Sequence, residues 1–417
     1  MVLAVTTLGT LLYSIIVFLL IIMLLVVMLL LARDRLAPKG DVTLHINDRQ
    51  LVVSPGSNLL STLSGNYIFL PSACGGGGTC GLCKCQIYEG GGSILPTETG
   101  FFTRKEQLDH WRLGCQVKIR ETMKIKVPES VLGIRKWECE VVSNKNVASF
   151  IKEFVVKLPE GEGLQFEPGG YVQIDVPKYQ VSFRDFNIEE EFRDEWDKYK
   201  LWDLGIKNTT ETYRAYSMAN YPAEKNLIKL NIRIATPPWD NERKQYMNVP
   251  PGICSTYLFS RKSGDKVMVS GPFGEFHIRN TNNEMVYIGG GAGMAPLRSH
   301  IFHLFHTLKT TRKVSYWYGA RSKREVFYED EFRALEREFP NFRFYLALSE
   351  PRPEDNWTGF TGFIHQVLFD NYLGKLDEPE EIEYYLCGPP LMNSAVIKMI
   401  YDLGIPDENL SFDDFGI

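Results

Sequence analysis

Apolar side chains form one uninterrupted segment near the start of this chain of 417 residues and alternate with polar ones after it. Residues 11–32 read LLYSIIVFLLIIMLLVVMLLLA and contain no charge. This run predicts a helix long enough to cross the roughly 30 Å hydrocarbon layer of a membrane. A cleaved signal peptide has a basic start and an apolar core of about 7 to 15 residues, so we predict a permanent anchor. A buried core helix is the alternative, but nothing on this helix is polar enough to face water.

Basic residues flank the anchor on one side only. No Lys or Arg precedes it, whereas Arg33, Arg35 and Lys39 follow at once. Cytoplasmic flanks of membrane helices carry an excess of such residues, so we expect everything after residue 32 to lie in the cytoplasm.

Three hydrophobic patterns follow the anchor. Short strands, VTLHI and RQLVVS, precede the helical NLLSTLSG. Next come β-rich stretches such as IKEFVVKLP and GGYVQIDVP, separated by turn residues as in an antiparallel barrel. From EMVYIGGGAGM on, strands and helices alternate, which predicts an α/β domain. We therefore expect a multidomain protein divided into residues 1–35, 36–130, 131–280 and 281–417.

Composition excludes some classes of function. The apolar fraction of 44% and the charged fraction of 23% are those of ordinary globular domains. The net charge of −5 argues against an electrostatic nucleic-acid binder, which would carry a basic face. We expect no nucleic-acid partner.

Four of the eight cysteines carry the first chemical signal. Cys74, Cys80 and Cys83 follow a C-x5-C-x2-C spacing in PSACGGGGTCGLCKC, and Cys115 stands apart in RLGCQ. A reducing compartment disfavours a disulfide framework and favours metal or redox chemistry. Structural zinc usually takes two close pairs. Three ligands in one loop with a remote fourth are typical of a 2Fe-2S cluster.

The glycines of this loop suit such a cluster. Residues 75–78 and Gly81 permit the left-handed turns and close backbone approach that a cluster requires. Cys85 lies on the next strand, and we interpret it as a buried small hydrophobe. The strands, the helix, the cysteine loop and RLGCQVKI together resemble the β-grasp fold of plant-type ferredoxins, although that family's commoner first spacing is C-x4-C. The resemblance implies that the four cysteines are the cluster ligands.

The motif YRAYSMANYP carries the second signal. On a strand, Arg214 and Tyr216 share one face, which places a cation for a phosphate beside an aromatic plane, and Ser217 adds a small donor. An ordinary strand with an Arg and a Tyr is the alternative. In PPGICSTYL, Gly252 precedes a predicted helix start with hydroxyls, a seat for a diphosphate. Those hydroxyls belong to Ser255 and Thr256.

These pieces, with GPFGEF, resemble the flavin domain of the ferredoxin-NADP reductase superfamily. The resemblance implies that Arg214 contacts the FAD phosphates, that Tyr216 packs on the isoalloxazine ring and that Ser217 bonds near its N5 atom.

A glycine turn between a strand and a helix carries the third signal. Gly291, Gly293 and Pro296 form G-x-G-x-x-P in place of the Rossmann G-x-G-x-x-G. The variant resembles the nicotinamide domain of the same superfamily, where backbone N–H groups of the turn face the pyrophosphate. By this resemblance Cys387 in CGPP positions the nicotinamide, and Phe415 in the terminal SFDDFGI covers the flavin. A small residue at a strand end and core packing of the tail are the alternatives.

Two other patterns receive plainer interpretations. His300, His303 and His306 recur at helical spacing among apolar residues, which favours helix packing over a metal site. Residues 183–213 are longer than a barrel loop needs, and their acidic and aromatic composition indicates a solvated insertion or a partner-docking surface.

The identity of the nicotinamide cofactor stays open on residues alone. Arg321, Lys323 and Arg324 offer charges for a 2′-phosphate, whereas Glu325 and the acidic residues 329–331 would repel one. The family resemblance decides for NADH.

The combined architecture predicts an electron-transfer enzyme. A hydride donor gives two electrons and an iron-sulfur cluster takes one, so a flavin must convert between them. The anchor, the cysteine spacing, RAYSMANYP and the insertion together resemble the F-subunit family of sodium-translocating NADH:quinone reductases. This implies partner subunits in the bacterial inner membrane, ubiquinone as acceptor and a sodium pump. The alternatives are an anchored reductase that feeds an oxygenase and a zinc-binding module.

Overall fold

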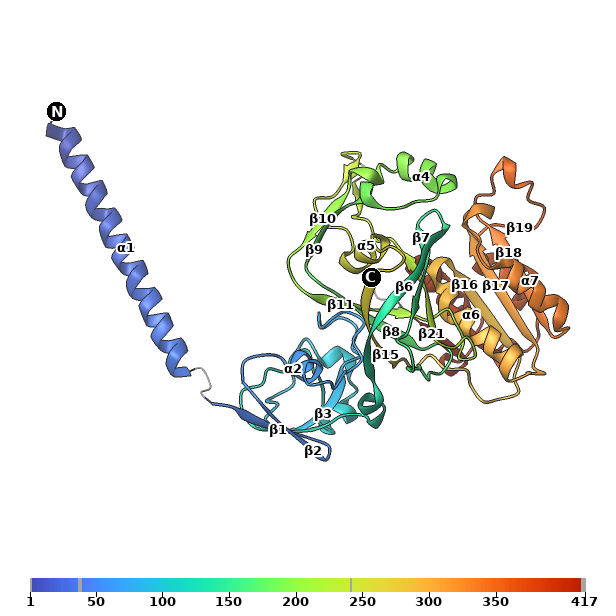
Figure 1. Ribbon diagram of the computed structural model, residues 1–417, viewed down its shortest axis with the longest axis horizontal. Helices are drawn as coiled ribbons and strands as arrows, with labels where there is room; N and C mark the ends of the chain where they lie inside the picture. The colour runs from blue at the N-terminus through green and yellow to red at the C-terminus, as the bar shows by residue number, and fades with distance from the viewer. Residues whose placement is uncertain (1, 37–39, 241, 414–417) are drawn as a thin grey trace. The chain divides into compact units, whose positions relative to one another are not determined.

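The computed structural model describes residues 2–36, 40–240 and 242–413 (Figure 1). The chain divides into two compact units. The first contains residues 1–66 and Cys83–Pro128, and the second contains Tyr67–Leu82 and residues 129–417. The predicted cysteine loop is therefore shared, because its first part belongs to the second unit and its last part to the first.

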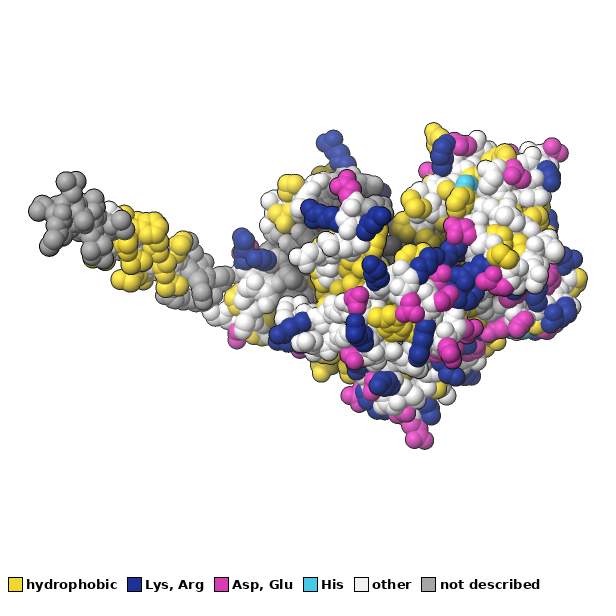
Figure 2. Space-filling view, turned by 90° about the horizontal axis from the view of Figure 1, so that it is seen from above, with side chains coloured by type: hydrophobic (Ala, Val, Ile, Leu, Met, Phe, Trp, Pro, Cys, Tyr) yellow, Lys and Arg dark blue, Asp and Glu magenta, His cyan; other side chains and the backbone are white. Residues whose placement is uncertain are grey.

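The helix predicted near the N-terminus is confirmed as α1 (Val2–Leu36). Within it, Tyr13–Leu31 has a mean hydropathy of 3.5, and none of it is buried. Figure 2 shows the described side chains of this helix as a hydrophobic surface, with Phe18 and Leu24 each 63% exposed. A helix that is apolar on every side requires an apolar surrounding, so α1 is a candidate membrane anchor.

The first unit contains a five-stranded sheet with strand order β2-β1-β5-β3-β4. Strands β1 and β2 form an antiparallel hairpin, whereas β1 and β5 run parallel. Helix α2 buries Leu59, Leu60 and Leu63, and its N-terminus is capped by the Asn58 side chain, which accepts a hydrogen bond from the Ser61 N–H. The elements of this predicted β-grasp fold are β1 (Val42–Ile46), β2 (Arg49–Val53), α2 (Leu59–Gly65), β3 (Lys84–Glu89), α3 (Arg104–Leu108), β4 (Trp111–Leu113) and β5 (Met123–Lys126).

The predicted antiparallel barrel forms the first half of the second unit. Its six strands have the order β11-β8-β15-β6-β7-β12. An antiparallel bridge between Met218 and Leu230 joins the two edges and closes the sheet. Its elements are β6 (Arg135–Ala148), β7 (Ile151–Lys157), β8 (Tyr171–Val176), β11 (Thr212–Ser217), β12 (Leu227–Arg233), β13 (Trp239–Asp240), β14 (Gln245–Tyr246), α5 (Ile253–Phe259) and β15 (Lys266–Phe273).

The insertion at residues 183–213 is not a solvated loop. It contains α4 (Arg193–Lys198) and β10 (Gly205–Asn208), which pairs with β9 (Tyr179–Ser182). Phe183 and Trp196 are fully buried, and the Trp196 ring lies 6.1 Å from the ring of Phe259 on α5. The aromatic residues of the insertion therefore enlarge the barrel core.

The last part of the second unit is the predicted α/β domain. Its parallel sheet has the order β19-β18-β17-β16-β20-β21. Helices α6 and α7 cover one face of the sheet, and α8 and α9 cover the other (Figure 1). The elements are β16 (Met285–Gly290), α6 (Met294–Phe302), β17 (Val314–Ala320), α7 (Glu329–Glu338), β18 (Phe342–Leu348), β19 (Phe360–Thr361), α8 (Ile364–Asn371), β20 (Glu383–Cys387), α9 (Pro390–Asp402) and β21 (Leu410–Asp413).

The interpretation of the histidine series as packing residues is confirmed for His300 on α6. This residue is fully buried, and its Nε2–H donates to the carbonyl oxygens of Phe276 at 3.0 Å and Pro168 at 3.1 Å. His306 lies against the rings of Tyr221 and Phe302. These contacts account for His300 and His306 as packing residues.

Candidate functional site

The first part of the cysteine loop brings two of the predicted ligands together. The Sγ atoms of Cys74 and Cys80 are 3.3 Å apart. The hydrogen bond from Cys80 lowers the pKa of Cys74 to about 3, helped by backbone N–H groups that include those of Thr79 and Gly76 and opposed by burial. The loop thus provides a surrounding in which a thiolate is stable, as a cysteine that ligates iron requires.

Glycines make this geometry accessible. Gly75, Gly76, Gly78 and Gly81 all have φ between +65° and +88°, a region that costs other residues energy. The left-handed turns predicted for the loop are therefore confirmed at four positions.

The other two predicted ligands form a second pair in the first unit. The N–H of Gly114 donates to the carbonyl oxygen of Cys83 at 2.8 Å, which brings Cys115 beside Cys83. A hydrogen bond with Cys115 raises the pKa of Cys83. A pair of cysteine thiols is what each iron of a 2Fe-2S cluster takes. Cys85 is fully buried, as predicted, and burial raises its pKa to about 12.

Strand β11 carries the residues predicted to bind a flavin. Arg214 and Tyr216 lie opposite Ile174 and Val172 of β8, so both occupy the same face of the strand. Tyr216 packs against the barrel core, and burial raises its pKa well above the usual value. The Arg214 guanidinium is held by the carbonyl oxygen of Tyr213, at 2.8 Å from Nη1.

The start of α5 supplies the other predicted flavin contacts. Gly252 is the N-cap residue, and a Cβ placed there would lie 2.6 Å from the Cβ of Ala235. Ser255 Oγ is engaged within the protein, since it accepts from the Ala235 N–H at 3.1 Å and donates to the Gly252 carbonyl at 3.2 Å. Thr256 is fully buried, and its hydroxyl has no hydrogen-bond partner among the described residues. An orphaned buried hydroxyl beside a tight glycine fits a bound polar group such as a diphosphate.

Ser217 at the end of β11 reaches the α/β domain. Its hydroxyl donates to Asp413 Oδ2 at 2.8 Å. Asp413 is the last described residue of β21 and lies opposite Cys387, which ends β20 and is fully buried. The structure thus places two predicted catalytic residues near Asp413, because Ser217 donates to its carboxylate and Cys387 lies opposite it in the sheet. The third, Phe415, lies outside the described residues.

The glycine turn packs tightly on the end of β20. Gly291 has a φ of +54°, and a Cβ on Gly293 would lie 2.0 Å from the carbonyl oxygen of Cys387. Pro296 is the third residue of α6, where a missing N–H costs no helical hydrogen bond. The turn therefore brings the start of α6 beside Cys387.

Comparisons with known protein families match the same three regions of the chain. Residues 42–120 match the family model of the 2Fe-2S iron-sulfur cluster binding domain. Residues 200–278 match the oxidoreductase FAD-binding domain, and residues 287–398 match the oxidoreductase NAD-binding domain. The chain therefore has binding domains for all three predicted cofactors.

Full-length relatives decide the family. The F subunit of the Na(+)-translocating NADH-quinone reductase of Pseudomonas aeruginosa is 55% identical over 387 residues, which cover 93% of this chain and 94% of the relative. That of Methylococcus capsulatus is 55% identical over 386 residues, with coverages of 92% and 94%. The chain belongs to the F-subunit family of the Na(+)-translocating NADH-quinone reductase.

Solved structures share the fold of this F-subunit chain. A cytochrome P450 reductase from Amycolatopsis, GcoB, superposes with a TM-score of 0.62 at 22% identity, over 90% of this chain and 98% of the other. The ferredoxin reductase of carbazole 1,9a-dioxygenase superposes with a TM-score of 0.56 at 24% identity and the same coverages. At these identities the likeness concerns the fold alone, and it includes all the folded domains of the F-subunit chain.

Sequence reasoning missed two features of this F-subunit chain. It assigned no role to Asp413, although the proximity of SFDDFGI to the C-terminus was a signal that the tail returns to the site. It also left open the role of Glu195 on α4, whose carboxylate contacts arginines that lie more than 120 residues away in the sequence. No local pattern marks such a contact.

Proposed function

We propose that this chain oxidises NADH and passes the electrons through FAD and a 2Fe-2S cluster to the membrane part of a sodium-translocating NADH:ubiquinone reductase. The hydrogen bond between Ser217 and Asp413 carries the proposal, because it joins the end of the FAD-binding strand to the β20–β21 edge of the NAD-binding sheet. A hydride is transferred only between groups held in contact, and this is where the two domains meet at chemically active side chains.

The proposed domain division follows the sequence boundaries. Residues 1–35 anchor the chain, 36–130 hold the cluster, 131–280 hold FAD and 281–417 hold NADH. The charges of Arg33 and Arg35 after the apolar helix support a cytoplasmic position for the last three, with the anchor in the bacterial inner membrane.

The chain's own residues would position the two nucleotides. Arg214 and the start of α5 would bind the FAD diphosphate, Tyr216 would pack on the flavin ring and Ser217 would hold a hydrogen bond near the reacting nitrogen. The glycine turn before α6 would seat the NADH diphosphate on backbone N–H groups. Cys387 would hold the nicotinamide at the sheet edge, and Phe415 would cover the flavin until the nicotinamide displaces it. The FAD-binding residues are Arg214, Tyr216, Ser217, Gly252, Ser255 and Thr256, and the NADH-binding residues are Gly291, Gly293, Pro296 and Cys387.

The cluster would be held by Cys74, Cys80, Cys83 and Cys115. When bound, FAD would supply the conversion between a two-electron hydride donor and a one-electron cluster. The loop that carries Cys74 packs against the barrel, since Gln173 Nε2 on β8 donates to the carbonyl oxygen of Ser72 at 3.3 Å. This contact supports a direct route from the flavin domain to the cluster.

Sodium translocation and ubiquinone reduction belong to partner subunits in this proposal. The span Tyr13–Leu31 contains no charged residue, and ion paths through membranes require polar or ionisable groups inside. The partners are therefore the other subunits of the membrane complex.

The test is anaerobic stopped-flow reduction of the detergent-solubilised full chain by NADH, followed in the flavin and cluster absorbance bands. We expect the flavin to bleach first and the cluster next. Serine variants of the four proposed ligands should lose the cluster bands and keep flavin reduction, whereas Cys85→Ser should keep both. An intact cluster that stays oxidised while the flavin is reduced would refute the proposed electron path.

A further inference from the structure

The end of β17 holds a concentration of cations. In doubly wound nucleotide-binding sheets, an acidic residue beyond the glycine turn binds the ribose 2′-hydroxyl of NAD, and an arginine there accepts the 2′-phosphate of NADP. Strand β17 is the parallel neighbour of β16, which leads into the glycine turn. Arg321, Lys323 and Arg324 follow β17 directly, so NADPH would find three positive side chains in this region.

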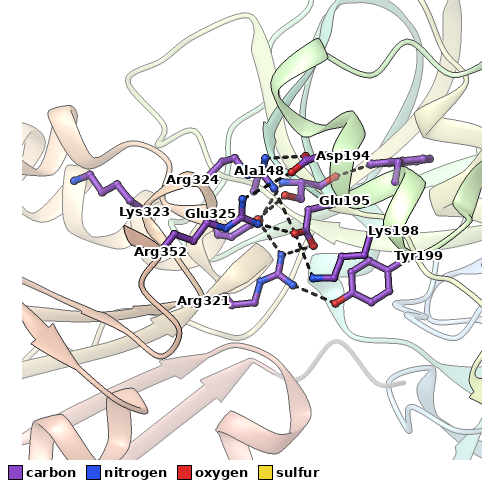
Figure 3. A network of polar contacts seen from close by, with 12 residues as sticks. Ala148, Asp194, Glu195, Lys198, Tyr199, Arg321, Lys323, Arg324, Glu325 and Arg352 are labelled. Atoms are coloured by element: carbon purple, nitrogen blue, oxygen red, sulfur yellow. Dashed lines mark hydrogen bonds and ion pairs between the residues drawn. The ribbon is translucent and has the colours of Figure 1, made fainter. Parts of the chain in front are cut away.

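Carboxylates of helix α4, which belongs to the insertion, form ion pairs with the arginines among these cations. Arg321 Nη2 donates to Glu195 Oε2 at 2.8 Å, and Arg324 Nη1 donates to Asp194 Oδ1 at 2.8 Å (Figure 3). Arg352 also joins the network, with Nη2 donating to Glu195 Oε1 at 2.6 Å. The two carboxylates of α4 thus hold three arginines of the NAD-binding domain.

The remaining charges are balanced within the NAD-binding domain. Arg321 also pairs with Glu325 at 3.3 Å, and Lys323 pairs with Glu329. The ion pairs around Arg321 connect four cations with four carboxylates, and their formal charges cancel. The cations are Lys198, Arg321, Arg324 and Arg352, and the carboxylates are Asp194, Glu195, Glu325 and Glu354.

Glu195 is held in place and remains charged. The residue is 2% exposed. Burial by itself would raise its pKa, but the hydrogen bond and charge of Arg321, with those of neighbouring cations, lower it overall. The adjacent Trp196 is fully buried, and its Nε1–H donates to the carbonyl oxygen of Ser149 at 2.7 Å. The helix therefore presents fixed negative charge to the arginines.

We propose that α4 makes the enzyme selective for NADH over NADPH. Asp194 and Glu195 occupy the guanidinium groups that would otherwise bind a 2′-phosphate, and they repel such a dianion. An uncharged ribose meets neither obstacle. Discrimination then arises from a repulsive element against the competing ligand rather than from an added contact to NADH. This inference rests on the proposed NADH oxidation and assigns a role to the insertion.

The test compares kcat/KM for NADH and NADPH in the full chain and in Glu195→Gln and Asp194→Asn variants. Glu190→Gln is the matched control, because Glu190 is an exposed carboxylate of the same insertion. We expect each α4 variant to raise the NADPH to NADH ratio of kcat/KM about tenfold through a lower KM for NADPH, since one repulsive charge is removed and the arginines that it held are released. Inhibition by 2′-AMP should strengthen by a similar factor, and inhibition by 5′-AMP should not.

The FAD content of each variant shows whether α4 acts on specificity or only on the structure. Variants that retain FAD but keep the wild-type ratio and 2′-AMP inhibition would overturn the inference and leave α4 as a tie between domains. Asp194→Asn serves as a second variant in case Glu195→Gln does not fold. The Asp194 side chain is 58% exposed, so its replacement leaves the buried core intact. Failure of the wild-type chain to accept electrons from NADH would instead refute the proposed function.

Discussion

The Ser217 hydroxyl donates to Asp413 Oδ2 at 2.8 Å, although 196 positions separate the two residues in the chain. Ser217 ends β11 of the barrel, and Asp413 ends β21 of the parallel sheet. Asp413 also lies opposite Cys387 in the sheet, so the predicted flavin-binding serine contacts a residue whose strand pairs with that of the predicted nicotinamide-binding cysteine. The contact fixes the rotamer of the serine at the junction of the two domains.

Loss of this contact should slow hydride transfer. We expect Asp413→Ala to reduce the rate of flavin reduction by NADH about tenfold or more, because a serine that has lost its acceptor aligns less well with its target. Asp402→Ala, at an exposed surface pair with Lys398, should leave the rate unchanged. Single-turnover kinetics with saturating NADH measures the effect. Equal rates in both variants would mean that Asp413 positions nothing.

The glycine turn should not tolerate even one added methyl group. A Cβ on Gly293 would lie 2.0 Å from the carbonyl oxygen of Cys387, so Gly293→Ala must push the turn away from β20. We expect NADH binding to weaken at least about tenfold, since backbone displacements near 1 Å at such sites are costly. Gly163→Ala meets nothing within 4 Å and is the control. Titration of bound NADH by fluorescence compares the two, and unchanged affinity in Gly293→Ala would contradict the packing argument.

The first unit should depend on a buried ion pair. Arg112 Nη2 lies 2.7 Å from Glu98 Oε2, with side chains 7% and 0% exposed, and Glu98 also accepts from the Leu113 N–H at 2.9 Å. Glu98→Gln leaves a buried guanidinium without its counter-charge, which should cost about 3–5 kcal/mol of unfolding free energy. Cluster absorbance should be lost at a lower temperature, because Cys115 lies three residues from Arg112.

The control for that prediction is an exposed pair of the same type. Lys84 and Glu106 lie 3.7 Å apart with side chains 38% and 34% exposed. Glu106→Gln preserves the capping box with Thr103 and should lower the unfolding free energy far less than Glu98→Gln does. Similar losses in the two variants would show that burial does not determine the strength of the Glu98 pair.

His300 should make the second unit sensitive to acid. Burial lowers its pKa from 6.5 to about 4, and the neighbouring imidazoles of His277 and His303 act in the same direction. The unfolded chain therefore binds a proton that the folded chain rejects between about pH 6.5 and pH 4. Stability should fall as the pH decreases through this window, by about 3 kcal/mol in total for this group.

A glutamine at position 300 tests the assignment, because its amide N–H can still donate to the Phe276 and Pro168 carbonyls without a titrating ring. Thermal unfolding of His300→Gln from pH 7 to pH 4 should show a weaker pH dependence than the wild type. His365→Gln, which alters a residue that is not fully buried, should keep the wild-type dependence. Identical pH dependence in the wild type and His300→Gln would reject His300 as the acid-sensitive group.

Patterns of neighbouring residues predicted those elements that depend only on residues close together in the chain. The apolar run predicted α1, the alternation predicted the barrel strands, and the cysteine loop needed its glycines at positive φ. The insertion was different, since its acidic and aromatic composition suggested solvent or a partner, yet Trp196 is fully buried. A short irregular segment has no period that reveals which side chains face the core, so its packing was not predictable.

The sequence by itself determined the order of domains, the membrane-length helix and the identity of the cofactor motifs, because each depends on residues close together in the chain. Only the tertiary structure decided which distant groups meet. Asp413 reaches Ser217, and Glu195 neutralises Arg321 and Arg352, since strand pairing and core packing bring their backbones together. A charge in a sequence does not specify its partner, and in a protein interior that partner determines whether an arginine is available to a phosphate.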